Sequence, residues 1–230
     1  SYYVILRVLL FILTPTAGIV DWRFTLAVLS AFTMTLGNLF ALAQQNVKRM
    51  ISYVCIADIG YNLVALISVT PIGLSGNLFF FFVAAVETAL VFMVVGVFRG
   101  MGLETFEDLS GLARKMPLTT LAFICAALSF SGVPLFGGYF AKYMVFTSVL
   151  QSDFAWLAIV GFLNSVLQTS YFLRIIHYLF SKTPTRDIEI KEPLKLLVPI
   201  YALVAILIIL GLFPSLVLDL LSSVTPFLPV

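Results

Sequence analysis

Three ionisable residues, Asp58, Glu87 and Lys142, lie inside long apolar runs of the sequence. A charge placed at the centre of a membrane costs about 2.5–3.5 kcal/mol even on a lenient insertion scale. An ammonium group held away from water also gives up its proton more readily than a solvated one. These residues are therefore candidates for moving protons. For each of them, a purely structural role such as a local pair that fixes the fold is the alternative.

The residues just before Lys142 are unusual for the interior of a membrane helix. The stretch SGVPLFGGYFAKYMVF (residues 131–146) contains Gly132, Pro134, Gly137 and Gly138. The proline removes a backbone donor, and the glycines let the chain leave helical geometry. We therefore expect two half-helices joined by an unwound piece at residues 131–138. Broken helices of this kind recur at ion sites in transporters.

The three ionisable residues are expected at a similar depth in the membrane. Lys142 lies about 12 Å from the outer end of its apolar run at residue 150, beyond the comfortable reach of a lysine side chain. Asp58 and Glu87 lie near the middle of two other runs. Three such residues at one level on separate helices predict a hydrated path or an internal line of ion pairs.

Two further residues, His177 and Lys48, are weaker candidates for the same path. His177 lies near the end of an apolar run, where it could feed protons inward or simply be an interfacial histidine. Lys48 precedes another run on the cation-rich side. It could mark proton entry or serve only to anchor the topology.

The composition is that of a polytopic membrane protein. Hydrophobic residues make up 61% of the chain and charged residues 10%, whereas soluble domains carry about 25% charged residues. Cys55 and Cys125 are too few for a disulfide framework or a metal site. The sequence opens on SYYVILRVLL without Met or a signal peptide, so we expect a fragment or a chain whose beginning is missing.

Seven apolar segments could cross or partly cross roughly 30 Å of hydrocarbon as helices. They cover residues 2–13, 24–43, 50–68, 78–98, 118–150, 154–180 and 196–218. The first contains Arg7 and is too short to cross fully. The fifth would be about 50 Å long as a continuous helix, so we expect it to cross once as the broken helix. The sequence thus predicts an all-α polytopic transmembrane bundle in a single domain over residues 1–230.

Lysine and arginine gather in the loops on one side of this predicted bundle. That side holds Lys48, Arg49, Arg99, Arg114, Lys115, Lys182, Arg186, Lys191 and Lys195, whereas the opposite loops hold only Arg23. Because cytoplasmic loops carry the excess of cations, we expect loops 44–49, 99–116 and 181–195 on the cytoplasmic or negative side and the C-terminus on the other. The membrane would be a bacterial or archaeal plasma membrane or an organellar inner membrane.

The sequence contains no nucleotide-binding fingerprint, no cysteine cluster for iron–sulfur, no paired histidines for haem and no nucleophile–base constellation. We therefore expect no cofactor and no nucleic-acid partner for this chain. If it serves a redox enzyme, the electron chemistry takes place in other subunits.

Three stretches of the sequence follow recurrent patterns. ALAQQNVKRMISYVCIADIGY is similar to Q-x-N-x-KR-x-x-x-Y-S-S-I, and FLNSVLQTSYFLRIIHY is similar to NS-x-x-x-x-YYLR. EDLSGLARKMPLTTLAFICAALSFSGVPLFGGYFAKYMVF is similar to GL-x-x-x-x-P followed by LSL-x-G-x-P-P-x-x-GF-x-x-K-x-x-x-F. The chain therefore resembles the antiporter-like membrane subunits of respiratory complex I. A lysine at position 142 together with the last stretch most resembles subunit N.

This resemblance implies a specific fold and activity. Members of the family have about fourteen helices in two inverted repeats, each with a broken helix, and the segments here correspond to the eighth to fourteenth. Lys142 corresponds to a proton-channel lysine in the second broken helix. The resemblance implies a proton-translocating subunit of an NADH:quinone oxidoreductase whose redox cofactors lie in partner subunits. Its partners would be other membrane subunits, the lipid membrane and protons.

The sequence also departs from the family patterns. The double serine is replaced by Val54 and Cys55, and the double proline by Pro134 and Leu135. Asp58 stands where the family often has histidine, and Glu87 where histidine, lysine or neutral residues are usual. The alternatives are an F420-type dehydrogenase, a membrane-bound hydrogenase, a multisubunit Na⁺(K⁺)/H⁺ antiporter, or a scaffold that pumps nothing.

Overall fold

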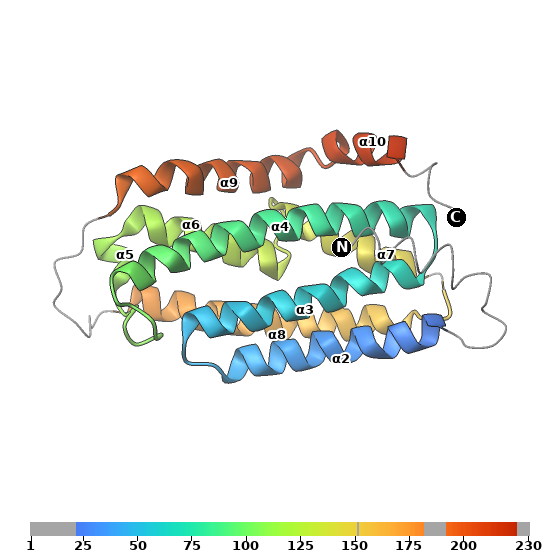
Figure 1. Ribbon diagram of the computed structural model, residues 1–230, viewed down its shortest axis with the longest axis horizontal. Coiled ribbons are helices and arrows are strands. Elements are labelled where there is room, and N and C mark those ends of the chain that lie inside the picture. The colour runs from blue at the N-terminus through green and yellow to red at the C-terminus, as the bar shows by residue number, and fades with distance from the viewer. Residues whose placement is uncertain (1–21, 151, 182–191, 225–230) are drawn as a thin grey trace.

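A computed structural model describes residues 22–150, 152–181 and 192–224, and these are almost entirely helical (Figure 1). The helices are α2 (Trp22–Ala43), α3 (Val47–Ile67), α4 (Pro71–Gly100), α5 (Leu112–Lys115), α6 (Pro117–Ser131), α7 (Gly137–Leu150), α8 (Trp156–Phe180), α9 (Leu194–Leu212) and α10 (Ser215–Val224). The predicted segment 2–13, with Arg7, lies outside the described residues.

Five of these helices are long and apolar enough to cross a membrane on their own: α2, α3, α4, α8 and α9. The helices α6 and α7 are shorter, about 22 and 21 Å long. They follow one another in the same direction along the bundle (Figure 1). The prediction of an all-α membrane bundle with one discontinuous helix over 118–150 is therefore confirmed.

The structure corrects two predicted segment boundaries. Helix α4 begins at Pro71 rather than at residue 78, because the Thr70 hydroxyl accepts the Gly73 N–H at 3.1 Å and caps the helix. Proline is favoured in the first turn of a helix, where its missing N–H has no role.

The single span predicted over residues 196–218 is wrong in the structure. Helix α9 ends at Leu212 and a separate helix, α10, begins at Ser215. Pro214 lies between them and lacks the N–H that a continuous helix would use. Pro199, by contrast, lies within the first two turns of α9 and does not end it.

Helix α4 occupies the middle of the bundle and packs against α3, α6, α7 and α9, while α2 packs along α3 and α8. The largest fully buried side chains are aromatic, including Tyr61, Phe79, Phe123, Phe130 and Phe172. Between helices in lipid, close packing supplies the attraction that the hydrophobic effect supplies in water. The outer surface is also apolar: Phe162 on α8 is 63% exposed and Val198 on α9 is 74% exposed.

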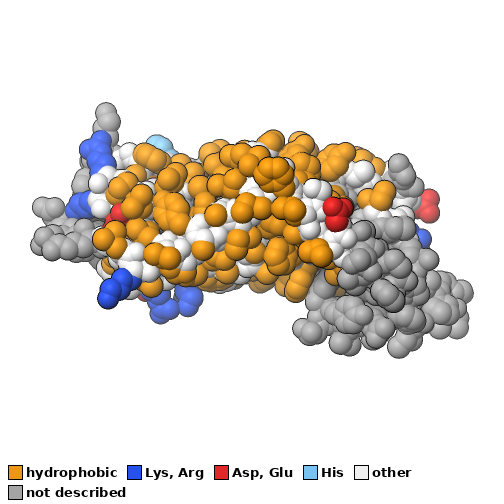
Figure 2. Space-filling view, turned by 90° about the horizontal axis from the view of Figure 1, so that it is seen from above, with side chains coloured by type: hydrophobic (Ala, Val, Ile, Leu, Met, Phe, Trp, Pro, Cys, Tyr) orange, Lys and Arg blue, Asp and Glu red, His pale blue; other side chains and the backbone are white. Residues whose placement is uncertain are grey.

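The connection between α2 and α3 and the connection that follows α4 meet at one end of the bundle. Asn46 pairs with Thr105 in an isolated antiparallel bridge, and the Gly111 N–H donates to the Tyr178 carbonyl at the end of α8. Lysine and arginine side chains are concentrated at that end, and an apolar surface covers the middle of the molecule (Figure 2). Loops 44–49 and 99–116 therefore share one end. Residues 182–191 of the third predicted loop lie outside the described residues.

Candidate functional site

The interruption between α6 and α7 is formed by a short non-helical turn. Gly132 caps α6 in the left-handed conformation (φ 75°), and the Val133 N–H donates to the Leu128 carbonyl at 3.0 Å. Leu135 has φ 109°, a value that side chains other than glycine rarely adopt. The Leu135 carbonyl packs directly against Gly211 on α9. Helix α9 therefore covers one carbonyl of the turn, a backbone group that could not face lipid unpaired.

Lys142 lies on α7 just beyond this interruption and is only 6% exposed. Its ammonium group donates to three acceptors: the Phe130 carbonyl at 2.7 Å, Gln168 Oε1 at 2.5 Å and Ser165 Oγ at 3.3 Å. It also lies 4.7 Å from the centre of the Tyr61 ring. All three ammonium protons therefore have a partner. The sequence correctly predicted that this cation is held out of water.

Asp58 on α3 is likewise 6% exposed, and it contacts the side-chain amide of Gln168, which also binds Lys142. Its Oδ1 accepts a long contact of 3.5 Å from Gln168 Nε2, whereas its Oδ2 is buried without a hydrogen-bond partner. No oxygen of Asp58 lies within 4.0 Å of the Lys142 ammonium. The two charges are therefore joined through Gln168 rather than by a direct ion pair.

Glu87 on α4 is 4% exposed and contacts both half-helices. Its Oε1 accepts the Ser129 hydroxyl proton at 2.5 Å, and Ser129 Oγ accepts the Gly138 N–H at 3.3 Å. A Cβ at Gly138 would lie 2.6 Å from Glu87 Oε1 and would overlap the Ser129 carbonyl. Only glycine at this position therefore lets the first turn of α7 approach both Glu87 and the Ser129 carbonyl this closely.

Lys142 and Glu87 each lie at a half-helix end that carries partial charge of the opposite sign. Lys142 binds the Phe130 carbonyl in the last turn of α6, where unpaired carbonyls carry partial negative charge. Glu87 lies beside Gly138 in the first turn of α7, where free N–H groups carry partial positive charge. The interruption therefore supplies favourable electrostatics that a continuous helix would lack at this depth.

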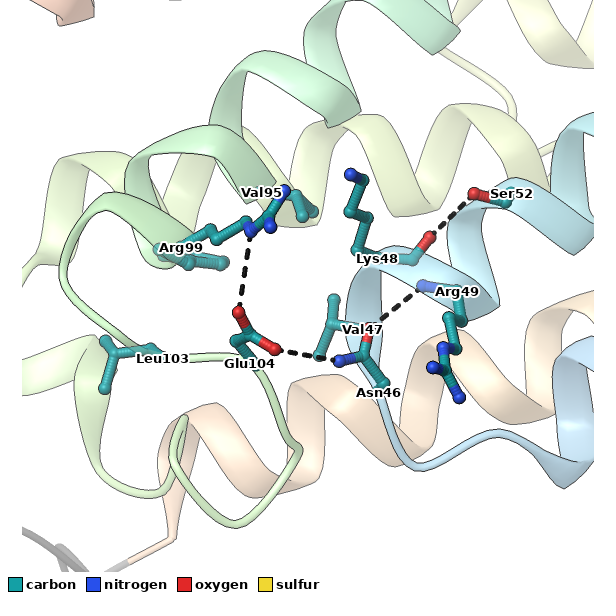
Figure 3. A pocket seen from close by; sticks show the side chains of 10 residues that line it. Asn46, Val47, Lys48, Arg49, Ser52, Val95, Arg99, Leu103 and Glu104 are labelled. Carbon is teal, nitrogen blue, oxygen red and sulfur yellow. Dashed lines mark hydrogen bonds and ion pairs between the residues drawn. The ribbon is translucent and has the colours of Figure 1, made fainter.

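Two of the predicted site residues lie outside this cluster. His177 is exposed in the last turn of α8, with its ring 6.2 Å from the ring of Tyr178. Lys48 is exposed in the first turn of α3, where it lines a pocket of about 270 Å³ with Arg49 and Arg99 (Figure 3). The structure thus joins Asp58 to Lys142 through Gln168 and joins Glu87 to α7 through Ser129, while His177 and Lys48 lie at the cation-rich end.

Several polar residues of the buried region were not singled out from the sequence. Gln168 links Lys142 to Asp58, and Ser129 links Glu87 to the first turn of α7, as described above. A second group joins α2 to α8: Asn38 Nδ2 donates to Asn164 Oδ1 at 3.1 Å, and the Tyr171 hydroxyl donates to Asn38 Oδ1 at 2.9 Å. The available signal was the spacing of Asn164 and Gln168, four residues apart and hence on one helix face in an apolar run.

Within the described residues, no group of three or more histidine, cysteine, aspartate or glutamate side chains is placed to hold a metal ion. Cys55 and Cys125 are both free thiols.

The sequence pattern of one family, described as NADH:quinone oxidoreductase/Mrp antiporter, TM, matches residues 1–168. The chain belongs to this family. Among its relatives is NADH-quinone oxidoreductase subunit N of Heliobacterium modesticaldum, 33% identical over 87% of the chain and 43% of that protein. F(420)H(2) dehydrogenase subunit N of Methanosarcina mazei is 32% identical over 89% of the chain and 44% of that protein. The chain therefore spans less than half the length of these curated relatives.

Solved structures of the family have the same fold. A chain of respiratory complex I from Thermus thermophilus with bound aureothin is 30% identical, with a TM-score of 0.73 over 85% of this chain and 44% of that chain. A chain of the Mrp complex from Dietzia sp. DQ12-45-1b has a TM-score of 0.89 over 99% of this chain and 50% of that chain, at 24% identity. The predicted resemblance to antiporter-like subunits, and to subunit N among them, is confirmed.

Proposed function

We propose that the chain is part of a proton-translocating membrane subunit in a redox-driven quinone oxidoreductase of the complex I type. The observation that carries this proposal is the Lys142 ammonium, which is buried beside an interrupted helix and bound to three neutral acceptors. A lysine with neutral partners can lose its proton without leaving a bonded carboxylate unpaired. The family membership and the similarity to subunit N relatives support the same activity.

The proposed path runs along the bundle from the cation-rich end to the opposite end. Protons would enter near Lys48 and His177, reach the buried cluster and leave past Lys142. Asp58 and Glu87 would act as charge partners or relays, since each lies within one hydrogen-bonded neighbour of Lys142 or of the interruption. Redox reactions in partner subunits would change the electrostatic field at Lys142 and the hydration around it.

We further propose that the chain corresponds to the C-terminal half of a fourteen-helix subunit. The share of each relative that it covers, 43% and 44% for the two described above, supports this. The remaining helices and the other subunits of the complex would be its partners, and the redox cofactors would be held there. The cation-rich end would face the cytoplasm or the equivalent negative side.

The test uses the whole complex reconstituted in sealed vesicles, with proton uptake measured during electron transfer. We expect Lys142→Ala to abolish proton uptake through this subunit while electron transfer persists, and Lys142→Arg to fail as well because arginine does not release its proton. Lys195→Ala is the matched control at an exposed position of the cation-rich end. Full coupled proton transport by Lys142→Ala would overturn the proposal and favour the scaffold alternative.

The second candidate is a subunit of a multisubunit cation/proton antiporter driven by an ion gradient. The family description includes Mrp antiporters, and the fold matches a chain of an Mrp complex. The two candidates differ in their energy source. Transport that depends on sodium or potassium and needs no electron donor would favour the antiporter, whereas transport that stops without donor would favour the redox-driven pump.

A further inference from the structure

The surface between α3 and α4 carries two pockets that follow one another along the same pair of helices. The first, of about 270 Å³, lies at the cation-rich end, where Lys48 and Ser52 line it from α3 and Arg99 from α4. The second, of about 280 Å³, lies nearer the middle of the membrane, where Ile59 lines it from α3 and Ala85 from α4. We call the two pockets together the α3–α4 groove.

Helical spacing places both pockets on one side of the helix pair. Residues 48, 52, 55, 59 and 62 of α3 recur at alternating steps of four and three, and so do residues 81, 85 and 88 of α4. Side chains spaced in this way share one face of a helix. The two pockets therefore follow one another along the same helix pair, from one end of the bundle toward its middle.

The first pocket carries uncompensated positive charge. Lys48, Arg49 and Arg99 line it together with one carboxylate, Glu104, which lies 3.5 Å from Arg99 and also accepts from the Asn46 amide at 3.3 Å. Neither Lys48 nor Arg49 has a carboxylate within 4.0 Å in the described part of the chain. Figure 3 shows Lys48 and Arg99 projecting from the two helices that border the opening.

The second pocket is apolar and open toward the membrane. The small side chains of Ala84 and Ala85 leave the space between the helices unfilled. Exposed apolar side chains border it, with Ile59 57% exposed and Phe81 47% exposed. A hydrocarbon chain can pack against this apolar border, while Asp58, Asn62 and Thr88 contribute polar atoms to the lining.

The separation of the pockets matches a membrane lipid. From Arg49 to Ile59 the helix rises about 15 Å, which is about half the thickness of the hydrocarbon layer. A phosphate group at the first pocket would therefore let an acyl chain of the same lipid extend along the second. Basic pockets between helices on the cytoplasmic side are suited to anionic headgroups.

We propose that the α3–α4 groove binds one anionic phospholipid, with its phosphate against Lys48 and Arg99 and an acyl chain along Ile59 and Ala85. A free phosphate ion would account for the first pocket only, and an apolar helix from a neighbouring subunit would account for the second only. Asp58 lines the second pocket. The acyl chain therefore closes the side of the buried cluster that faces the membrane.

The experiment compares two photoreactive lipids that carry a diazirine in the middle of the same acyl chain, phosphatidylglycerol and phosphatidylcholine. Each is added to vesicles that contain the whole complex, and adducts are mapped by mass spectrometry after illumination. We expect phosphatidylglycerol to label residues 55–62 and 81–88 more than phosphatidylcholine does. Because each cation near the surface contributes about fivefold to the affinity for anionic lipid, Lys48→Gln should lower this labelling about fivefold.

Two further variants separate the headgroup from the chain. Arg114→Gln removes one exposed charge at the same end but outside the groove, and it should leave labelling within about twofold of the unmodified chain. Ala85→Leu fills the second pocket and should lower the labelling of residues 55–62 and 81–88. Phosphatidylglycerol should still be preferred over phosphatidylcholine elsewhere at the cation-rich end. Added inorganic phosphate should compete only weakly.

Several results would overturn the proposal. Equal labelling by the two lipids, equal loss in Lys48→Gln and Arg114→Gln, or adducts confined to other helices would each exclude a lipid in this groove. Adducts on another subunit in place of residues 55–62 and 81–88 would indicate that a neighbouring helix occupies the groove. The comparison of the two lipids on the unmodified complex needs no variant, and the readout needs no turnover. Its failure would therefore leave the proposed proton transport untouched.

Discussion

The bundle contains two interrupted helices, and they differ in what surrounds them. Between α6 and α7 the turn itself is partly exposed, with Leu135 48% exposed, but the half-helix ends beside it gather the buried residues Glu87, Ser129 and Lys142. Between α9 and α10 the interruption is peripheral, with Phe213 57% exposed and Leu216 58% exposed. The first has ionisable partners from other helices, while the second has mainly apolar neighbours.

The backbone bonds explain why the second interruption needs no such partners. The Phe213 N–H donates to Ile209 at 2.8 Å, and the Val217 and Leu218 N–H groups both donate to the Pro214 carbonyl. Local bonds thus satisfy the chain where it leaves and re-enters the helix. A proline in an apolar run therefore predicts a break, but only a break with buried polar neighbours predicts a site.

The largest expected effect comes from closing the space between the two half-helices. Gly138→Ala should lower the free energy of unfolding by about 3 kcal/mol, because the new Cβ would overlap the Ser129 carbonyl and Glu87. Gly96→Ala in α4 is the matched control, since a Cβ there meets nothing within 4 Å. Thermal unfolding of the purified complex measures both. Equal melting temperatures would show that the close approach of Gly138 to Ser129 and Glu87 contributes nothing to stability.

The next effect comes from the amide that joins Lys142 to Asp58. Gln168→Leu removes an acceptor from the ammonium and the donor to the carboxylate, and hydrogen bonds to charged groups contribute about 1.5–3 kcal/mol. We expect a loss of stability of about 2 kcal/mol together with a loss of proton transport. Thr169→Val, one residue further along α8, should change neither. Normal transport in Gln168→Leu would show that the amide is dispensable.

A smaller effect is expected from Ser129, which links Glu87 to α7. Ser129→Ala leaves Glu87 Oε1 without its hydroxyl donor and should cost about 1–2 kcal/mol. Ser215→Ala, at the exposed start of α10, makes the same substitution beside the second interruption and should cost less than about 0.5 kcal/mol. Unfolding of the two variants under the same conditions gives the comparison. A reversed order would contradict it.

The smallest effect concerns Tyr61, whose ring lies against the Lys142 ammonium. Tyr61→Phe keeps the ring and loses only a hydroxyl 3.4 Å from Ser165, so stability should change by less than about 0.5 kcal/mol. Tyr61→Leu removes the ring and should cost about 1–2 kcal/mol more. Similar melting temperatures for the two variants would show that the ring contributes nothing to holding the cation.

The features that the sequence predicted are those set by local composition. Apolar run length places the helices, loop cations mark one end, and the glycines and proline before Lys142 mark the interruption. The prediction that Asp58, Glu87 and Lys142 share a depth required only their positions within the runs. The role of each residue in transport is still a proposal.

The connections between these residues depend on packing and were not predictable in the same way. Ser129 reaches Glu87 across 42 residues of sequence, and Gln168 reaches Asp58 across 110. Such contacts depend on the rotation of each helix about its axis, which hydropathy does not specify. The break at Pro214 was missed for a related reason: the residues on both sides are mostly apolar, so the run looks continuous.

Glu87 and Lys142 bind adjacent residues at the end of α6. Glu87 accepts from the Ser129 hydroxyl, and Lys142 donates to the Phe130 carbonyl. A single peptide unit therefore separates the attachment points of an acid and a base. Transfer of one proton from the ammonium to the carboxylate would turn two ions into two uncharged groups and leave their summed charge unchanged. The low-dielectric interior would then never have to accommodate an extra net charge from this pair during that exchange.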